Sequence, residues 1–230
     1  MNTLALDTST DILSIALETE TSYEERLIRS PRNHLESLLP EIEELSSRAS
    51  VKLSDLSLLV CTKGPGSFTG LRIGMATLKG LSAATGVPVV SIPTLDAISA
   101  TVGIYKGPVL SVIDAKKKRY YLSLTENGKE ILPASDISLE DALPLLEETE
   151  GRILITGPDA AVFAAKLPGT LDFIVDPLAP RNLSRALIAL GKRRLEQAGP
   201  DDIGEGPMYI RRSDAEEALE KKRKEYNEKL

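Results

Sequence analysis

Leu4-Ala5-Leu6-Asp7-Thr8-Ser9-Thr10 decides the fold: it is a short apolar run that stops at a turn of small polar residues. The residues after it, Ile12 to Leu17, alternate between apolar and polar side chains, which is typical of a half-buried strand. Residues 19–28 can return as a third strand. The opening therefore predicts an antiparallel meander with a polar turn at Asp7 to Asp11.

Helical and strand-like segments alternate after the meander. Asn33 is an expected N-cap and Glu36 its capping-box partner, so a helix should follow over Leu35–Ala49. The rest of this half reads as a buried strand at Leu56–Cys61, a helix at Phe68–Ala84, a strand at Val87–Ile92 and a helix through Leu95–Ile98.

The second half repeats this pattern. An apolar run at Val109–Ile113 ends at Asp114, an alternating run follows at Tyr120–Leu124, and the strand Ile153–Thr156 ends in Gly-Pro, as the earlier strand does at Gly64-Pro65. We interpret the repetition as a duplicated α/β unit.

A single offset relates the two halves. When Asp7 is superimposed on Asp114, the alternating residues Leu13, Ile15 and Leu17 fall on Tyr120, Leu122 and Leu124. We place the domain boundary near Tyr105 to Gly107, which gives domains at 1–106 and 107–230. The second domain should add a helix over Leu183–Leu195 and a polar helix over Ala215–Leu230.

Composition limits the chemistry. The chain has 230 residues, of which 42% are hydrophobic and 27% charged, as in a soluble globular protein. One Cys (Cys61) and one His (His34) exclude a disulfide framework and a closed Cys/His zinc site, so no metal site is expected. The net charge of -6 and the pI of about 5.1 disfavour a protein that holds a polyanion by itself. No signal peptide or membrane span is recognisable, so a cytoplasmic protein is expected.

The Asp7 turn and the segment Gly64 to Gly74 are the candidate anion or nucleotide site. A tight turn exposes amides and hydroxyls that can surround a phosphate, although Asp, Ser and Thr are also ordinary turn residues. The glycine segment follows a strand and opens a helix, which suits an anion, but it is neither a Walker A loop nor a dinucleotide fingerprint. Its glycines equally allow close helix packing. The candidate residues are Asp7, Thr8, Ser9, Gly64, Pro65, Gly66, Ser67, Thr69 and Gly70.

Other reactive or charged side chains carry weaker signals. His34, at a helix start, has no second histidine beside it, and Cys61 lies in an apolar run that is typical of a core position. Lys116-Lys117-Lys118-Arg119 occupies the turn that matches Asp7 to Ser9. It either contacts RNA phosphates or is simply a solvated turn.

Four stretches together resemble the TsaB family, the accessory subunits of the bacterial machinery that makes threonylcarbamoyladenosine in tRNA. They are Leu4–Thr10, Asn33–Pro40, Gly64–Gly74 with the following Pro88–Asp96, and Gly206–Glu216. The resemblance implies the duplicated actin-like ATPase (ASKHA) fold, with two βββαβα-type subdomains. It also implies a shortened relative of the catalytic subunit TsaD, whose metal-holding histidine pair this chain lacks.

The resemblance thus implies a non-catalytic subunit, with no catalytic residues of its own, that binds and activates a TsaD-type transferase. A TsaE-type protein would be the ATPase partner, tRNA would be contacted indirectly, and the chain would form a homodimer when alone. ATP or threonylcarbamoyl-adenylate is expected only within the complex. The pairing surface is expected on the two helices of the first half, at His34, Leu35, Leu38, Leu39, Ile42, Leu71, Arg72, Gly74, Met75 and Leu78.

Two other functions remain open from the residues. One is a nucleotide-dependent phosphotransferase or hydrolase with Asp7 as base or metal holder. The other is an actin-like interaction module of a different complex.

Overall fold

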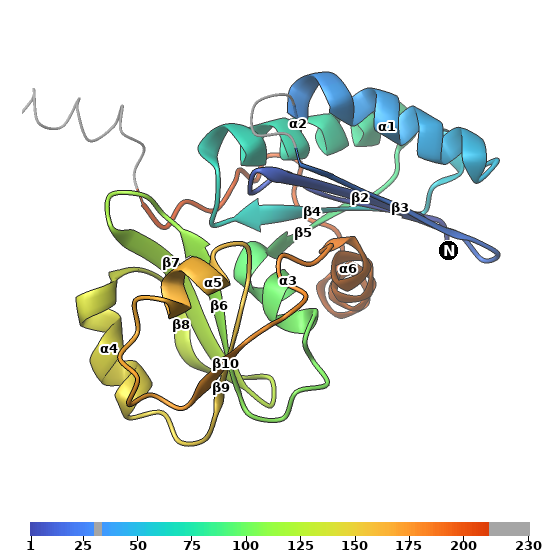
Figure 1. Cartoon of the computed structure of the whole chain (residues 1–230). Coiled ribbons are helices and arrows are strands. Elements are labelled where there is room, and N and C mark those ends of the chain that lie inside the picture. Colours follow the sequence, from blue (N-terminus) through green and yellow to red (C-terminus); the bar gives the residue numbers. More distant parts are fainter. Residues whose placement is uncertain (30–33, 212–230) are drawn as a thin grey trace, which may run out of the picture.

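The computed structural model describes residues 1–29 and 34–211 and contains two five-stranded sheets with helices between and outside them (Figure 1). The first half runs β1 (Thr3–Asp7), β2 (Ile12–Glu18), β3 (Tyr23–Arg29), α1 (His34–Arg48), η1 (Leu53–Asp55), β4 (Leu58–Gly64), α2 (Phe68–Thr85), β5 (Val89–Pro93) and α3 (Thr94–Ala100). The second runs β6 (Pro108–Asp114), β7 (Arg119–Glu126), β8 (Lys129–Ser138), α4 (Leu139–Glu147), β9 (Ile153–Thr156), α5 (Ala160–Ala164), β10 (Phe173–Val175) and α6 (Ser184–Ala198).

The two sheets share one topology, which confirms the duplicated actin-like α/β fold. The strand order is β3-β2-β1-β4-β5 in the first sheet, and β8-β7-β6-β9-β10 in the second. In each sheet the first three strands form an antiparallel meander and the other two run parallel to the first strand. The expected meanders, buried strands and helices are all present in the described residues, while the polar helix expected over Ala215–Leu230 lies outside them.

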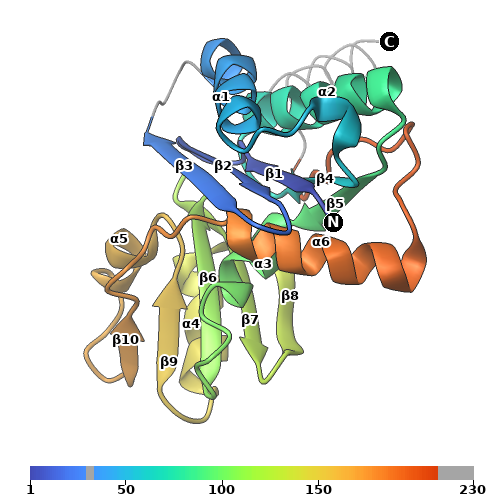
Figure 2. The ribbon, with the colours of Figure 1, turned by 90° about the vertical axis from the view of Figure 1, so that its right-hand side faces the viewer.

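Among the described residues, three large apolar clusters hold the layers together, and a small fourth one contains Val102, Val109 and Leu154. Helices α1 and α2 cover the outer face of the first sheet, and α4 and α5 cover the outer face of the second (Figure 2). Between the sheets lie α3 and α6, whose Leu95, Ile98, Leu187 and Ile188 pack in a shared core. Thus α6, although it follows the second sheet in the chain, packs on the first one.

The expected equivalence of Asp7 and Asp114 is wrong by one residue. The outward-facing Leu13 and Tyr120 do correspond, because each packs under the outer helices of its own half. Asp7, however, is paired with Ser14 on the inner face of its sheet, and the matching inner pair in the second half is Ile113 with Tyr121. The second connection is one residue longer, and since side chains alternate along a strand, Asp114 points to the opposite face from Asp7.

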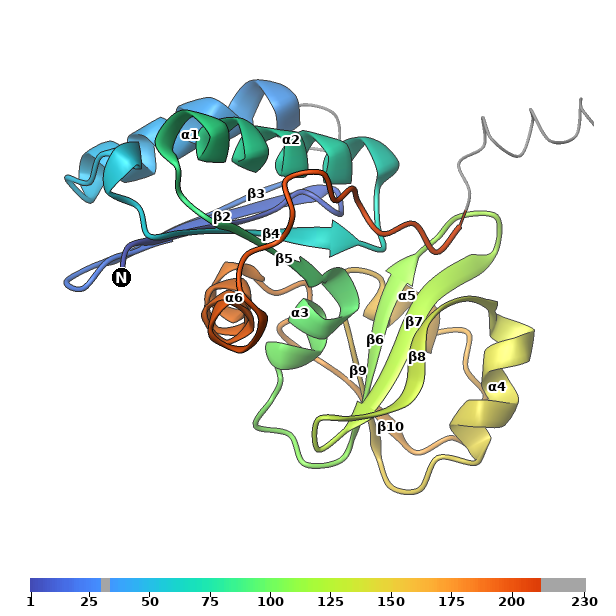
Figure 3. The ribbon, with the colours of Figure 1, turned by 180° about the vertical axis from the view of Figure 1, so that it is seen from behind.

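A strap follows α6 and ties the halves together. We use this name for residues 199–211, which run from the end of α6 along β5 and α2 and then across to the tops of β7 and β8 (Figure 3). Asp201 accepts hydrogen bonds from the amide and hydroxyl of Ser91, at 2.7 and 2.5 Å. Further along, the amide of Met208 donates to the carbonyl of Lys63 at 2.6 Å.

Candidate functional site

A cavity of about 570 Å³ opens between the two halves at the turns that end β1 and β6. Its first-half wall consists of Ser9–Ile12, Arg29 and Gly66–Phe68, and its second-half wall of Ile113–Lys117, Tyr121, Pro158-Asp159 and Arg211. The Asp7 turn and the glycine segment, which we predicted as the anion site, both border this cavity, and the basic turn that begins at Lys116 borders it from the other half. The cavity is therefore the candidate ligand site of the fold.

Asp7 does not face that cavity. The residue is only 2% exposed, and its Oδ1 accepts hydrogen bonds from the hydroxyl of Thr62 at 2.7 Å and from the amide of Ser9 at 2.9 Å. It borders instead a separate small cavity of about 20 Å³, beside Ser14. In this position the carboxylate holds the turn in shape, so the structure gives no support to Asp7 as a base or metal holder for a ligand in the large cavity.

The glycine segment packs tightly on the Asp7 turn. A Cβ on Gly66 would come within 2.4 Å of the Ser9 carbonyl oxygen, and one on Gly70 within 1.9 Å of the Thr8 carbonyl oxygen. Hydrogen bonds reinforce the contact, because the Thr8 hydroxyl donates to the Gly70 carbonyl and the Ser67 amide donates to the Ser9 carbonyl, both at 2.7 Å. The glycines thus allow the helix to approach the turn.

A part of the predicted set still faces the cavity. Ser9, Gly66 and Ser67 line it. Thr8 and Gly70 instead contact each other where the helix packs on the turn. Gly64 and Pro65 are buried, the former beside the strap, and Thr69 is exposed on α2. The hydroxyl of Ser9 is buried, and within the described ranges no hydrogen-bond partner reaches it. It is a polar group that a ligand at this end of the cavity could satisfy.

The second-half wall is a strained basic turn. Lys116, Lys117 and Lys118 all have positive φ, at 61°, 54° and 60°, a region that residues other than glycine, asparagine and aspartate seldom occupy. Asp114 stabilises it, since its Oδ1 accepts from the Lys116 amide at 2.7 Å and its Oδ2 lies 3.2 Å from Lys116 Nζ. The second of these hydrogen bonds raises the pKa of Lys116. The Asp114 amide in turn donates to Asp159 at 2.8 Å.

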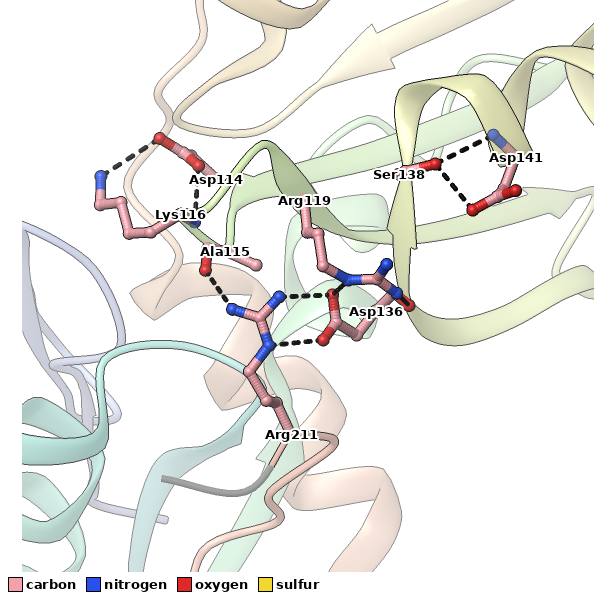
Figure 4. A network of polar contacts seen from close by, with 8 residues as sticks. All are labelled: Asp114, Ala115, Lys116, Arg119, Asp136, Ser138, Asp141 and Arg211. Carbon is pink, nitrogen blue, oxygen red and sulfur yellow. Dashed lines mark hydrogen bonds and ion pairs between the residues drawn. The ribbon is translucent and has the colours of Figure 1, made fainter. Parts of the chain in front are cut away.

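An arginine network closes the cavity where the strap reaches the second sheet (Figure 4). Arg211 donates from Nε and Nη2 to the two oxygens of Asp136, at 2.6 and 3.0 Å, and from Nη1 to the Ala115 carbonyl at 2.7 Å. Arg119 donates to the same carboxylate at 2.8 Å. Sequence reasoning assigned no role to Arg211 or Asp136, because nothing local in the sequence relates residues so far apart in the chain.

A second buried pair was also missed. The Asp176 side chain is 1% exposed and receives two hydrogen bonds from Arg181, at 2.6 and 2.8 Å, besides one from the Thr156 hydroxyl. Burial alone would raise the pKa of Asp176, but the hydrogen bonds from Arg181, the Leu178 amide and Thr156 together lower it. The pair fixes the connection from β10 to α6 and does not line the large cavity.

Most of the residues expected at a pairing surface lie in the chain's own core. Leu38, Ile42, Leu71, Gly74, Met75 and Leu78 are buried. This expectation needs correction, because the apolar stripes of α1 and α2 face their own sheet and leave little side chain for a partner. Leu39 is 51% exposed, Arg72 is exposed and donates to the Tyr209 hydroxyl at 2.8 Å, and the side chains of His34 and Leu35 lie outside the described ones.

The described residues also bear on the expectations about membranes and metals. None of the helices there is both long and apolar enough to cross a membrane. Between residues 1–29 and 34–211, no group of three or more His, Cys, Asp or Glu side chains is arranged to hold a metal ion. The expected absence of a metal site stays a prediction.

Comparison with known proteins gives consistent matches. Residues 28–182 match the family model of TsaD, tRNA N6-adenosine threonylcarbamoyltransferase. The tRNA threonylcarbamoyladenosine biosynthesis protein TsaB of Bacillus subtilis is 30% identical over 94% of this chain and 96% of its own length. TsaB of Escherichia coli is 32% identical over 53% of each chain. A crystal structure from Pseudomonas aeruginosa, described as similar to peptidase YEAZ, superimposes with a TM-score of 0.77 at 25% identity, covering 91% of this chain and 99% of that one.

Proposed function

The chain belongs to the TsaB family of tRNA threonylcarbamoyladenosine biosynthesis proteins, and from this membership we propose that it is the accessory subunit that binds and activates a TsaD-type transferase. Its role lies in tRNA threonylcarbamoyladenosine biosynthesis. In the proposed division of labour, a TsaE-type partner hydrolyses ATP, the transferase modifies the adenosine next to the anticodon, and this chain has no catalytic residues.

The outward face of α2 is the observation that carries the pairing proposal. After the exposed Arg72, its exposed positions include Ala76, Gly80 and Ala83, which form a strip of small residues along the C-terminal part of this 18-residue helix. Among the described residues, a Cβ on Gly80 would meet nothing within 4 Å. Glycine inside a helix costs about 1 kcal/mol relative to alanine, and no contact with residues 1–29 or 34–211 requires one at this position. A partner helix that approaches closely supplies the missing reason.

The neighbouring helix completes the proposed surface. Helix α1 lies beside α2 on the same outer face of the first sheet (Figure 2), and its Leu39 is exposed. The pairing surface that we propose is therefore the exposed strip of α2 together with Leu39, in place of the buried leucines. Without a TsaD-type partner, the same surface would pair two copies of this chain.

Reconstitution tests the proposal. The chain is combined with its cognate TsaD-type and TsaE-type proteins, tRNA, threonylcarbamoyl-adenylate and ATP, and threonylcarbamoyladenosine is quantified by mass spectrometry. Omitting the chain should abolish or strongly reduce the product. If the partners modify tRNA equally well without it, the proposal fails.

A matched pair of variants tests the surface. Gly80→Leu should remove co-elution with the transferase in size-exclusion chromatography and lower tRNA modification. Gly169→Leu makes the same chemical change at a glycine of the second half where a Cβ would also meet none of the described residues within 4 Å, and it should leave co-elution and tRNA modification unchanged. Thermal melts of the isolated variants establish that each is folded.

The competing proposal is a nucleotide-dependent phosphotransferase or hydrolase, and the cavity of about 570 Å³ between the halves is what favours it. Calorimetry with ATP on the isolated chain discriminates between the two. Tight binding together with turnover that is lost in Asp7→Ala would support the enzyme. The burial of Asp7 and its hydrogen bonds to Thr62 and Ser9 argue against it.

A further inference from the structure

The glutamates of helix α1 lie on two different sides of the helix. Its sequence contains four glutamates and one arginine. Glu44 is ion-paired with Arg26 of β3 at 3.0 Å and with Arg48 at 2.7 Å. Glu41 also approaches Arg26, at 3.6 Å. The charges on the side of α1 that faces β3 are therefore neutralised within the chain.

The other two glutamates, Glu36 and Glu43, lie on the outward face of α1. Both are exposed, and because they are seven residues apart, they lie two turns apart on the same face. Leu39, which is 51% exposed, lies one turn from each of them. Within residues 1–29 and 34–211, no cation lies within ion-pair distance of either carboxylate. This face thus presents an apolar side chain between two exposed carboxylates.

Helix α2, which lies beside α1 (Figure 2), has its two cationic side chains on the strap. Arg72 is exposed and donates to the Tyr209 hydroxyl at 2.8 Å. Lys79 donates to the carbonyls of Ile203 and Glu205. The strip of small residues on α2 is uncharged. The proposed pairing surface is therefore apolar in its middle and negative on the α1 side, with Arg72 at the strap.

We propose that this surface binds a helix of the transferase that carries lysine or arginine side chains opposite Glu36 and Glu43. The inference rests on the proposed function, in which the chain pairs with a TsaD-type subunit, and it adds the chemistry of recognition. Leu39 and the strip of small residues allow close apolar packing. Cations on both sides of that contact would neutralise the two carboxylates. Complementary charges of this kind contribute mainly to the rate and the selectivity of association.

The same carboxylates disfavour a second copy of the chain at this surface. In a symmetric pair a surface meets itself, so α1 of one copy faces either α1 or α2 of the other. In the first arrangement glutamates face glutamates, and in the second they face a helix whose cations already bind the strap. Placing like charges against each other is a common way to reject a wrong partner. The two glutamates thus favour the transferase over self-pairing.

The experiment compares two double variants of the full chain. In the first, Glu36 and Glu43 are both replaced by Gln. The control replaces Glu140 and Glu147 of α4, which are also exposed, seven residues apart and without an ion pair to the described residues. Glu36 and Glu140 each lie in the first turn of their helix, so effects on helix stability are matched. Both variants change the net charge equally, and thermal melts establish that each is folded.

Binding to the transferase provides the first readout, measured by biolayer interferometry from low to high salt. Loss of Glu36 and Glu43 should weaken the complex about fivefold at low salt, because exposed ion pairs contribute modestly and are screened by salt. The affinity of this variant should also depend less on salt. The control should bind as the parent does. Equal affinity of the parent and the Glu36/Glu43 variant, or an equal loss in the control, would overturn the inference.

Self-association provides the second readout, measured by analytical ultracentrifugation. The Glu36/Glu43 variant should form dimers at a lower concentration than the parent at low salt. Added salt should strengthen self-association of the parent, because it screens the repulsion between carboxylates. If parent and variant self-associate to the same extent, the two glutamates do not reject a second copy, and the inferred selectivity is refuted.

The two readouts separate the inference from the proposed function. A parent chain that does not bind the transferase refutes the proposed function. A parent chain that binds it, with an affinity that the Glu36/Glu43 substitution does not change, refutes only the basic partner helix.

Discussion

Arg211 and Asp136 form a two-pronged ion pair, Nε to Oδ2 at 2.6 Å and Nη2 to Oδ1 at 3.0 Å, across 75 positions of the chain. Both side chains are only 13% exposed. The pair joins the strap to β8, and the strap is bonded at its other end to β5. The two halves are therefore linked by side-chain chemistry as well as by the connection between α3 and β6.

Replacing Arg211 by Met should lower the free energy of unfolding by about 2–3 kcal/mol, because the largely buried Asp136 carboxylate loses both hydrogen bonds from Arg211 and keeps only Arg119 as a cation. Arg152→Met is the matched control. It breaks an Arg–Asp pair with a similar distance, 2.7 Å to Asp172, but both partners are 61% exposed, so the change should be within about 1 kcal/mol. Urea denaturation followed by circular dichroism measures both. Equal effects of the two substitutions would contradict a linking role for Arg211.

Gly70→Ala should destabilise the chain by about 3 kcal/mol, because the new methyl group overlaps the Thr8 carbonyl oxygen and the helix must move off the turn. Gly80→Ala, on the exposed face of the same helix, should instead raise the free energy of unfolding by about 0.5–1 kcal/mol through helix propensity. The midpoints of urea denaturation of the two variants and the parent measure both changes in stability. A Gly70→Ala variant as stable as the parent would mean that turn and helix are not in tight contact.

Arg181→Met should cost about 3 kcal/mol near neutral pH, since the buried Asp176 carboxylate keeps its charge but loses its cation. The folded pKa of Asp176 is lowered, so the stabilisation is complete above the unfolded pKa of about 3.9 and is lost as the pH falls below it toward the folded value. In the variant, the hydrogen bonds from the Leu178 amide and Thr156 remain but those from Arg181 are lost, so burial raises the pKa of Asp176 above its value in the parent.

The difference in stability between the parent and Arg181→Met should therefore narrow as the pH falls from about 7 to about 3. Urea titrations at several pH values measure it. A stability difference that stays constant over this pH range would show that it does not come from the ion pair between Arg181 and Asp176.

Cys61 should be inert to thiol reagents in the folded chain. Cys61 is 0% exposed. Its burial raises the pKa of the thiol to about 12, and the negative charges of Asp201 and Asp7 contribute to this increase. Reaction with a chromogenic disulfide at pH of about 8 should be slow in buffer and release one thiol per chain in denaturant. Rapid stoichiometric labelling of the native chain would contradict the burial of this strand.

The elements were predictable where periodicity and turn chemistry agree. The run Leu4–Leu6 with its polar turn, and the alternation from Ile12 to Leu17, identify the meander because strand period and turn residues indicate the same structure. The glycine segment was also recognisable, but its role was not. Only the contact of Gly70 with Thr8, 62 positions apart, shows that packing uses most of its glycines.

Other features depend on long-range geometry. The match of Asp7 with Asp114 is wrong because the turn between β6 and β7 is one residue longer than the turn between β1 and β2. Asp114 therefore points to the opposite face of its sheet, and a constant offset between the two sequences does not show this. The pairing residues were misplaced for a similar reason. An apolar stripe such as Leu71 with Leu78 reads alike whether it faces the chain's own sheet or a partner, and the structure assigns it to the sheet.

The crossing of α6 has a consequence for the repeat itself. Leu187 and Ile188 of this helix cover the inner face of the first sheet, and a Cβ on Gly191 would lie 2.5 Å from the Val60 side chain. A fragment 1–106 would leave that face open to water, and a fragment 107–230 would carry a helix with nothing to cover. The first sheet thus takes the helix on its inner face from the second half of the chain, so residues 1–106 contain the strands of that sheet but lack part of the core that stabilises it.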